Sequence, residues 1–204
     1  MKTTSGPESV CRQRLNRFAI ATLLATAGLL AFAWPANAEV VYTRTNVSID
    51  TGMLTYELDL NNDGITDVTI QLEVGSFVCT KFPPCSAETY TFLEFPASGN
   101  GVLGKPPAAL KKGAQIGPDQ TFFAGDGTMS YLAVAGRTCE YCGSHSGNWY
   151  LTPTGYLGME FQIQGETHYG WARFSLVQEG KALTLTGYAY ETVAGMPINA
   201  GQTK

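Results

Sequence analysis

Between residue 39 and the C-terminus, apolar residues occur in short alternating runs that turn residues separate, and no helical periodicity is found. Alternation with a period of two is typical of β-strands that bury one face, whereas an amphipathic helix needs apolar residues every three or four positions. Charged residues make up only 15% of the chain, which excludes a long coiled coil and a charge-rich disordered protein. The sequence therefore predicts an all-β fold, a single antiparallel sandwich-like domain over residues 39–204.

The first 38 residues have the three parts of an export signal. Basic residues between Lys2 and Arg17 precede an apolar run from Phe18 to Trp34, and Ala36-Asn37-Ala38 supplies the small-x-small cleavage pattern. An uncleaved membrane anchor is the alternative, but the run of 17 residues is at the lower limit for spanning a bilayer. We therefore predict cleavage after Ala38, no membrane span in the mature chain, and a secreted or periplasmic location.

The mature chain that this cleavage would leave is acidic. Residues 39–204 carry nine basic and 16 acidic side chains, for a formal charge of −7. A nucleic-acid-binding surface needs clustered lysine and arginine, and this part of the sequence holds no such run. We expect no nucleic-acid partner.

Four cysteines follow the predicted cleavage point: Cys79, Cys85, Cys139 and Cys142. An even number in an exported chain is typical of disulfides, and the spacing favours the local pairs 79–85 and 139–142. A Cys-x-x-Cys redox motif should open a helix, whereas Gly-Ser-His-Ser-Gly follows Cys142 here. A four-cysteine zinc site is the other alternative, and an oxidising compartment disfavours it. We predict two structural disulfides.

The C-terminal part predicts three consecutive strands, Tyr156–Ile163, His168–Val177 and Ala182–Tyr190. A type II′ turn at Gly165-Glu166 would place Gln164 opposite Thr167, and a turn at Glu179-Gly180 would place Gln178 opposite Lys181. The segment Pro96–Thr128, with seven glycines and four prolines in 33 residues, is expected to be largely loop or short edge strands.

The expected register sorts the side chains of these strands onto two faces. Trp171 would lie opposite Tyr188, Tyr169 opposite Tyr190, and Glu160 diagonal to Arg173. Aromatic pairs stabilise a sheet, and an exposed aromatic face would also form a platform for sugar rings. Both interpretations stay open, with Tyr169, Trp171, Tyr188 and Tyr190 as candidate ligand-contact residues. The opposite, apolar face collects Leu157, Met159, Phe161, Ile163, Phe174, Leu176, Leu183 and Leu185.

The segment from Asp59 to Asp67 resembles the front of a calcium-binding loop. Oxygen-bearing side chains fall at its positions 1, 3, 5 and 9, glycine is at position 6, and the carbonyl of Ile65 would be the position-7 ligand. Position 12 is Ile70 rather than a bidentate glutamate, and the flanking runs predict strands rather than helices. We predict a structural Ca²⁺ at a hairpin tip, held by Asp59, Asn61, Asp63, Ile65 and Asp67 plus water; a polar turn without an ion is the alternative.

Little in the sequence favours catalysis, and no catalytic residue is predicted. The segment 143–147 has His145 where a nucleophile elbow has serine, and His168 is expected to be a partly buried, hydrogen-bonded residue at the start of a strand. A glycosidase needs two carboxylates across a groove, for which Glu160 and Glu166 are the available candidates.

Two C-terminal runs, Gly165 to Phe174 and Leu183 to Thr192, carry a resemblance to a known group of proteins. They resemble the "GETHYGWARL…LTGYAYET" segment of uncharacterised exported bacterial proteins, many of which end in a PEP-CTERM sorting tail. The resemblance implies a β-protein with an early Asp-x-Asn-x-Asp-Gly segment, and it implies no activity. No Pro-Glu-Pro tail follows Glu191 here, which disfavours sorting by that route.

These observations together predict an exported, non-enzymatic, calcium-stabilised module that binds a glycan or a cell-envelope component, or contributes to an envelope or matrix. The first alternative is a secreted polysaccharide hydrolase with Glu160 as a carboxylate. The second is a purely structural surface protein with no saturable ligand.

Overall fold

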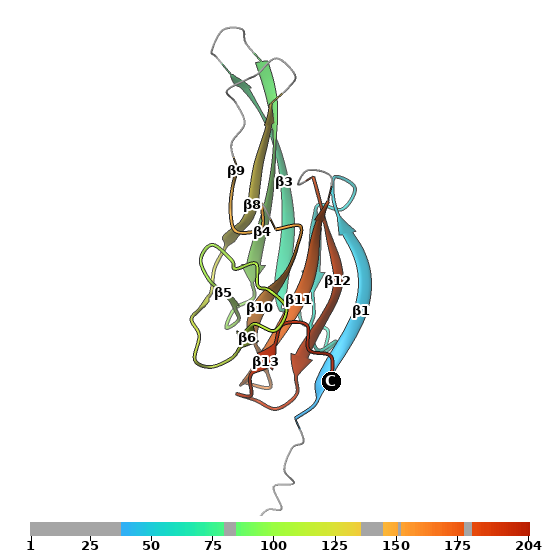
Figure 1. Cartoon of the computed structure of the whole chain (residues 1–204), viewed down its shortest axis with the longest axis vertical. Coiled ribbons are helices and arrows are strands. Elements are labelled where there is room, and N and C mark those ends of the chain that lie inside the picture. The colour runs from blue at the N-terminus through green and yellow to red at the C-terminus, as the bar shows by residue number, and fades with distance from the viewer. Residues whose placement is uncertain (1–37, 80–84, 136–144, 151, 178–180) are drawn as a thin grey trace, which may run out of the picture. The chain divides into compact units, whose positions relative to one another are not determined.

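Two antiparallel β-sheets packed face to face form the fold in the computed structural model, which describes residues 38–79, 85–135, 145–150, 152–177 and 181–204 (Figure 1). The six-stranded sheet has the order β1 (Val40–Ile49), β12 (Ala182–Glu191), β11 (Glu166–Val177), β10 (Thr154–Ile163), β5 (Gly101–Leu103) and β7 (Phe122–Phe123). The five-stranded sheet has the order β2 (Thr55–Leu58), β3 (Val68–Cys79), β4 (Cys85–Pro96), β8 (Gly127–Ala135) and β9 (His145–Ser146). The prediction of an all-β, antiparallel sandwich-like fold is confirmed.

The described residues contain no helix, and so none of them belongs to a helix that could cross a membrane. The three predicted C-terminal strands are present as β10, β11 and β12. The segment 96–128 holds only the short strands β5, β6 (Gln115–Ile116) and β7 before β8 begins, as expected from its glycines and prolines.

The main core lies between the two sheets. The six-stranded sheet contributes the inward-facing residues of β10, β11 and β12, including Phe161, Phe174 and Leu185, none of which is exposed. The five-stranded sheet contributes the alternating residues Ile70 and Phe92 and their neighbours. All eight residues of the predicted apolar face belong to this core or pack against it: Leu157, Met159, Phe161, Ile163, Phe174, Leu176, Leu183 and Leu185.

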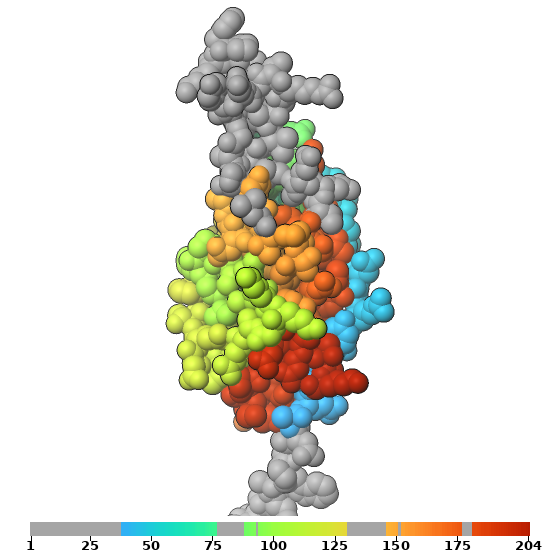
Figure 2. Space-filling view, in the orientation of Figure 1, coloured from blue at the N-terminus to red at the C-terminus, as the bar shows by residue number. Residues whose placement is uncertain are grey.

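A second, smaller core lies on the outer face of the six-stranded sheet. Two chain segments cover this face, and they pair with each other where β6 meets β13 (Ile198–Asn199). In Figure 2 the segment around residues 100–128 and the C-terminal segment lie next to each other on this side of the molecule. The sheet and the two covering segments together contribute the buried residues of this core: Val40, Ile116, Tyr169, Trp171, Ala189, Ile198 and Ala200.

The turn between β10 and β11 differs from the prediction by one position. Gln164 and Gly165 have φ angles of 53° and 85°, so they form the two central residues of the turn, and Ile163 pairs with Glu166. Positive φ at both central positions is the type I′ pattern, whose twist matches that of the flanking strands. The predicted type II′ turn at Gly165-Glu166 is therefore wrong. Each pair shifts by two residues, an even number, so the faces of β10 and β11 are as expected.

A β-bulge changes the register between β11 and β12. Phe174 pairs with Leu185 as predicted, but Arg173 pairs with Gly187, which leaves Thr186 as an extra residue. The Thr186 hydroxyl donates to the carbonyl oxygen of Arg173 at 3.2 Å, which supplies that carbonyl with a partner at the bulge. Beyond this point every side chain of β12 changes face. The predicted pairs Trp171–Tyr188 and Tyr169–Tyr190 are therefore wrong.

Candidate functional site: the loop from Asp59 to Asp67

The predicted calcium loop is the connection between β2, which ends at Leu58, and β3, which begins at Val68. It lies at a hairpin between two strands, as the sequence predicts. Asn62 and Gly64 have positive φ angles of 58° and 86°, so the sharp turn falls on the two residue types that best accept this conformation.

The loop's own carboxylates hold its backbone in this shape. Asp59 accepts hydrogen bonds from the N–H groups of Asp63 and Gly64, at 3.3 and 2.8 Å. Asp63 accepts one from the N–H of Ile65 at 2.8 Å and one from the Asn61 amide nitrogen at 2.9 Å. Asp59, Asn61 and Asp63 thus lie around one turn of the loop. These contacts alone would equally suit the polar turn without an ion.

Asp67 closes the base of the loop and is buried, with 5% of its surface exposed. Its carboxylate accepts the N–H of Leu60 at 2.8 Å and the side-chain amide of Asn100 at 3.2 Å. Asn100 also accepts the N–H of Gln162 in β10 at 3.1 Å, so it links the loop to the six-stranded sheet. No local signal in the sequence marks Asn100 as this link.

The loop carries concentrated negative charge. Burial, with smaller contributions from the nearby carboxylates of Asp59 and Asp63, raises the pKa of Asp67 to about 6, against the opposing effect of its hydrogen bonds to Leu60 and Asn100. A divalent cation would relieve this repulsion and lower the pKa of Asp67.

The donor set has the chemistry that Ca²⁺ prefers. It offers carboxylate, amide and carbonyl oxygens, and the amide oxygen Oδ1 of Asn61 is buried without a hydrogen-bond partner. In the part of the chain that the structure describes, no three acidic, histidine or cysteine side chains converge on one point. A calcium ion here would therefore depend on Asn61, the carbonyl of Ile65 and water as well as on the carboxylates.

The candidate ligand-contact residues do not form an exposed face. Tyr169 and Trp171 are 5% and 2% exposed within the outer core, and the Trp171 indole donates to the carbonyl of Gln202 at 3.2 Å. The bulge turns Tyr188 and Tyr190 to the opposite side, where Tyr188 is 7% exposed and Tyr190 packs edge-on against Phe161. The prediction of an exposed aromatic platform is therefore wrong, and the buried positions of these residues support a role in stabilising the sheet.

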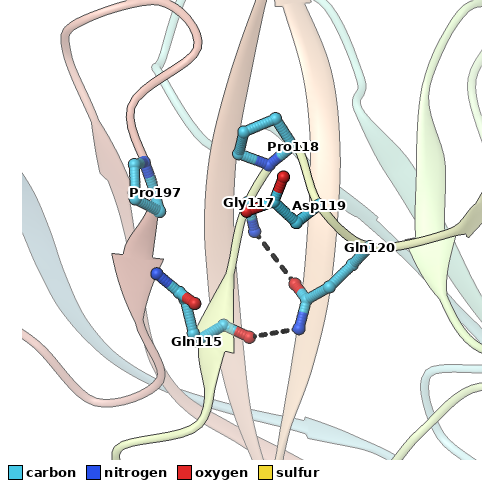
Figure 3. A pocket seen from close by; sticks show the side chains of 6 residues that line it. All are labelled: Gln115, Gly117, Pro118, Asp119, Gln120 and Pro197. Carbon is cyan, nitrogen blue, oxygen red and sulfur yellow. Dashed lines mark hydrogen bonds between the residues drawn. The ribbon is translucent and has the colours of Figure 1, made fainter.

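The structure places two open surfaces elsewhere. The β2–β4 groove, of about 440 Å³, is lined by Leu54, Thr55, Gln71, Leu72, Glu73, Val74, Gly75, Thr89 and Thr91. The proline pocket, of about 180 Å³, is lined by Gln115, Gly117, Pro118, Asp119, Gln120 and Pro197 (Figure 3). In the proline pocket the Gln120 side chain accepts a hydrogen bond from the N–H of Gly117 and donates one to the carbonyl of Gln115. Its amide group therefore already has partners within the protein. Of these two surfaces of the described residues, the β2–β4 groove is the one with the size typical of a small-ligand site.

Neither surface resembles a glycosidase site, since neither combines two carboxylates. Glu160 lies opposite Tyr169, so the predicted proximity to Arg173 is wrong, because the register differs and Arg173 instead donates to Thr186. Burial raises the pKa of Glu160. Glu166 is the exposed first residue of β11. His168 is buried with its Nδ1 at 2.9 Å from the carbonyl of Glu191, so the expected hydrogen bond is confirmed and the residue is more fully buried than expected.

The cysteine predictions fall largely outside the described residues. Cys139 and Cys142 belong to the segment 136–144, which lies outside the described residues, and so does the side chain of His145. The backbone register places Cys79 directly opposite Cys85 at the end of the β3–β4 ladder. Their side chains are not described, so both disulfides stay predictions.

Two buried carboxyl groups were not singled out by sequence reasoning. Glu94 in β4 is 1% exposed, and its Oε2 has no hydrogen-bond partner. Glu191 at the end of β12 is 3% exposed and accepts the N–H of Val193 at 3.0 Å. The only sequence signal for either is its position within an otherwise apolar strand face.

Comparison of the chain with protein-family models, curated proteins and solved structures finds no significant match.

Proposed function

We propose that this protein is an exported, non-enzymatic β-sandwich module of the cell envelope or extracellular matrix, whose fold is completed by a structural Ca²⁺ in the loop from Asp59 to Asp67. The observation that carries the calcium part is the buried, unpartnered Oδ1 of Asn61 beside Asp59, Asp63 and the buried Asp67. The export signal in residues 1–38 supports the location. Calcium is plentiful outside cells, where modules of this kind bind it with dissociation constants of about 10⁻⁴–10⁻³ M.

Calcium is expected to raise the melting temperature, because an ion that binds only the folded state stabilises it. At 10 mM Ca²⁺ and the affinities above, the stabilisation is about 1.4–2.7 kcal/mol. The measurement is thermal unfolding of the exported protein in chelator, in Ca²⁺ and in Mg²⁺. Asp63→Ala should remove the response, whereas Asp119→Ala, an exposed acidic residue outside the loop, should keep it. Equal melting temperatures in chelator and Ca²⁺ would favour the polar turn without an ion.

The β2–β4 groove is the surface that best supports a glycan ligand, now that the aromatic residues are known to be buried. Hydroxyl, amide and carboxylate groups of Thr89, Thr91, Gln71 and Glu73 line it, and such groups hydrogen-bond sugar hydroxyls. Glu73 pairs with Thr91 and Gly75 with Thr89 on adjacent strands. Gly75 has no side chain to fill the space beside Thr89, and a Cβ there would lie 2.6 Å from the threonine hydroxyl oxygen.

A glycan array of the exported protein tests this ligand class. Saturable binding is expected to be lost in Thr91→Arg, which fills the groove, and kept in Thr154→Arg, which places the same side chain on an exposed position of β10. A blank array from folded protein would favour the purely structural alternative. The hydrolase alternative would need product release that Glu160→Gln abolishes.

A further inference from the structure

The backbone nitrogen of Glu39 lies between two hydrogen-bond acceptors. It is 3.2 Å from Oε1 of Glu191 and 3.3 Å from Oγ1 of Thr192. A backbone amide carries one hydrogen, so the two acceptors have to share it, whereas an ammonium group carries three. The site therefore offers more acceptors than the amide of an uncut chain can serve.

Glu39 is held firmly at this site. Its carbonyl accepts the N–H of Thr192 at 3.0 Å, and the next residue, Val40, pairs with Glu191 in the ladder between β1 and β12. The compact unit of the structure begins at Ala38, and both Ala38 and Glu39 are exposed. The nitrogen that cleavage after Ala38 would free is thus already in contact with its acceptors.

The Glu191 side chain lacks a cationic partner. It is 3% exposed, and throughout the described part of the chain no lysine or arginine pairs with it. Its Oε1 instead accepts the N–H groups of Val193 and Glu39. The other titratable groups here are the Glu39 side chain and His168, whose ring contacts the Glu191 carbonyl. A buried carboxylate is costly unless a charge of opposite sign is beside it.

We propose that Glu191 and Thr192 form a binding site for the α-ammonium group of the processed N-terminus. The inference rests on the proposed export cleavage. In that step water adds across the Ala38–Glu39 peptide bond, Ala38 leaves with a carboxylate, and the Glu39 nitrogen gains protons to become an ammonium. A shared amide hydrogen bond is thereby replaced by charge-assisted bonds to Glu191 and Thr192. Removal of the leader then stabilises the fold directly.

The test compares free and blocked N-termini of the exported protein. N-terminal sequencing first has to give Glu39; another start would overturn the inference without affecting the calcium experiment. Selective acetylation of the α-amino group then restores a neutral amide with one hydrogen. In urea unfolding of the wild-type protein, acetylation is expected to lower the folded-to-unfolded ratio roughly tenfold or more, because it removes the cationic partner of the buried Glu191 carboxylate.

Two variants make the result specific. In Glu191→Gln the effect of acetylation should largely disappear, and in Glu166→Gln, at the exposed first position of β11, it should persist. An equal effect in wild type and Glu191→Gln would overturn the proposal. If Glu191→Gln does not fold, the proposal is tested instead by the acetylation rate of the wild-type α-amino group. Pairing predicts a rate that is much lower in the folded protein than in urea, and equal rates would overturn the proposal.

Discussion

Replacing Trp171 with alanine is expected to destabilise the protein by about 3–5 kcal/mol, a large part of the stability of an ordinary domain. The indole is 2% exposed and lies where β11 meets the two covering segments. Tyr156 packs edge-on against it with ring centroids 5.2 Å apart, and Tyr42 lies at 5.8 Å. The substitution would leave a cavity among these rings and remove the partner of the Gln202 carbonyl.

Urea unfolding followed by far-ultraviolet circular dichroism measures this loss without relying on tryptophan fluorescence. Phe123→Ala is the matched control, since this aromatic residue is 37% exposed on a short strand at the edge of the same sheet. Its change in unfolding free energy should stay within about 0.5 kcal/mol. A Trp171→Ala protein that kept its full stability and lost only glycan binding would contradict the buried placement and restore the aromatic platform.

The sequence predicts that Trp171 lies in a strand, but it does not predict whether the indole is exposed or buried. Strand positions and the inward face of β10 and β11 could be predicted because alternation is a local signal. The turn at Gln164-Gly165 lies one position before the predicted one, so the cross-strand partner of each residue shifts by two positions. An even shift leaves every side chain on the predicted face. The extra residue at Thr186 moved the register by one, and this reversed Tyr188 and Tyr190.

The cover over Trp171 could not be predicted for a different reason. It is made by contacts between segments that are distant in sequence, such as β6 with β13. The position of the candidate calcium loop, Asp59 to Asp67, at a hairpin could be predicted, but its contacts with distant segments could not. The link from Asp67 through Asn100 to Gln162 joins residues that no local pattern connects.

The stability of the protein is expected to fall as the pH rises from about 6 to 8, because of Glu94. Burial, with a smaller contribution from nearby Asp126, raises the pKa of this carboxyl group from 4.5 to about 8, against the opposing effect of Lys105. The unfolded chain releases the proton near pH 4.5, whereas the folded protein keeps it until about pH 8. Each pH unit between these values therefore costs up to about 1.4 kcal/mol, and the loss ends above the folded pKa.

Contacts around Glu94 explain why its charged form is disfavoured. Gly127 lies directly opposite on β8, and a Cβ there would collide with Oε1 of Glu94 and lie 3.0 Å from the ring of Pro107. The carboxyl group is thus enclosed by backbone and a proline ring, and its Oε2 has no hydrogen-bond partner. Water cannot solvate an ionised carboxylate that is 1% exposed, so the proton stays.

Glu94→Gln isolates this contribution, because the amide has the shape of the protonated acid and cannot ionise. Urea unfolding between pH 6.5 and 8.5, with chelator present, lies above the midpoint of the Asp67 titration, since the pKa of Asp67 is about 6. Wild type should lose stability steeply over this range and Glu94→Gln much less, whereas Glu73→Gln, at an exposed position of β3, should follow wild type. Parallel pH profiles for wild type and Glu94→Gln would mean that the carboxylate is already ionised in the fold. A cation such as Lys105 would then have to lie close enough to compensate its charge.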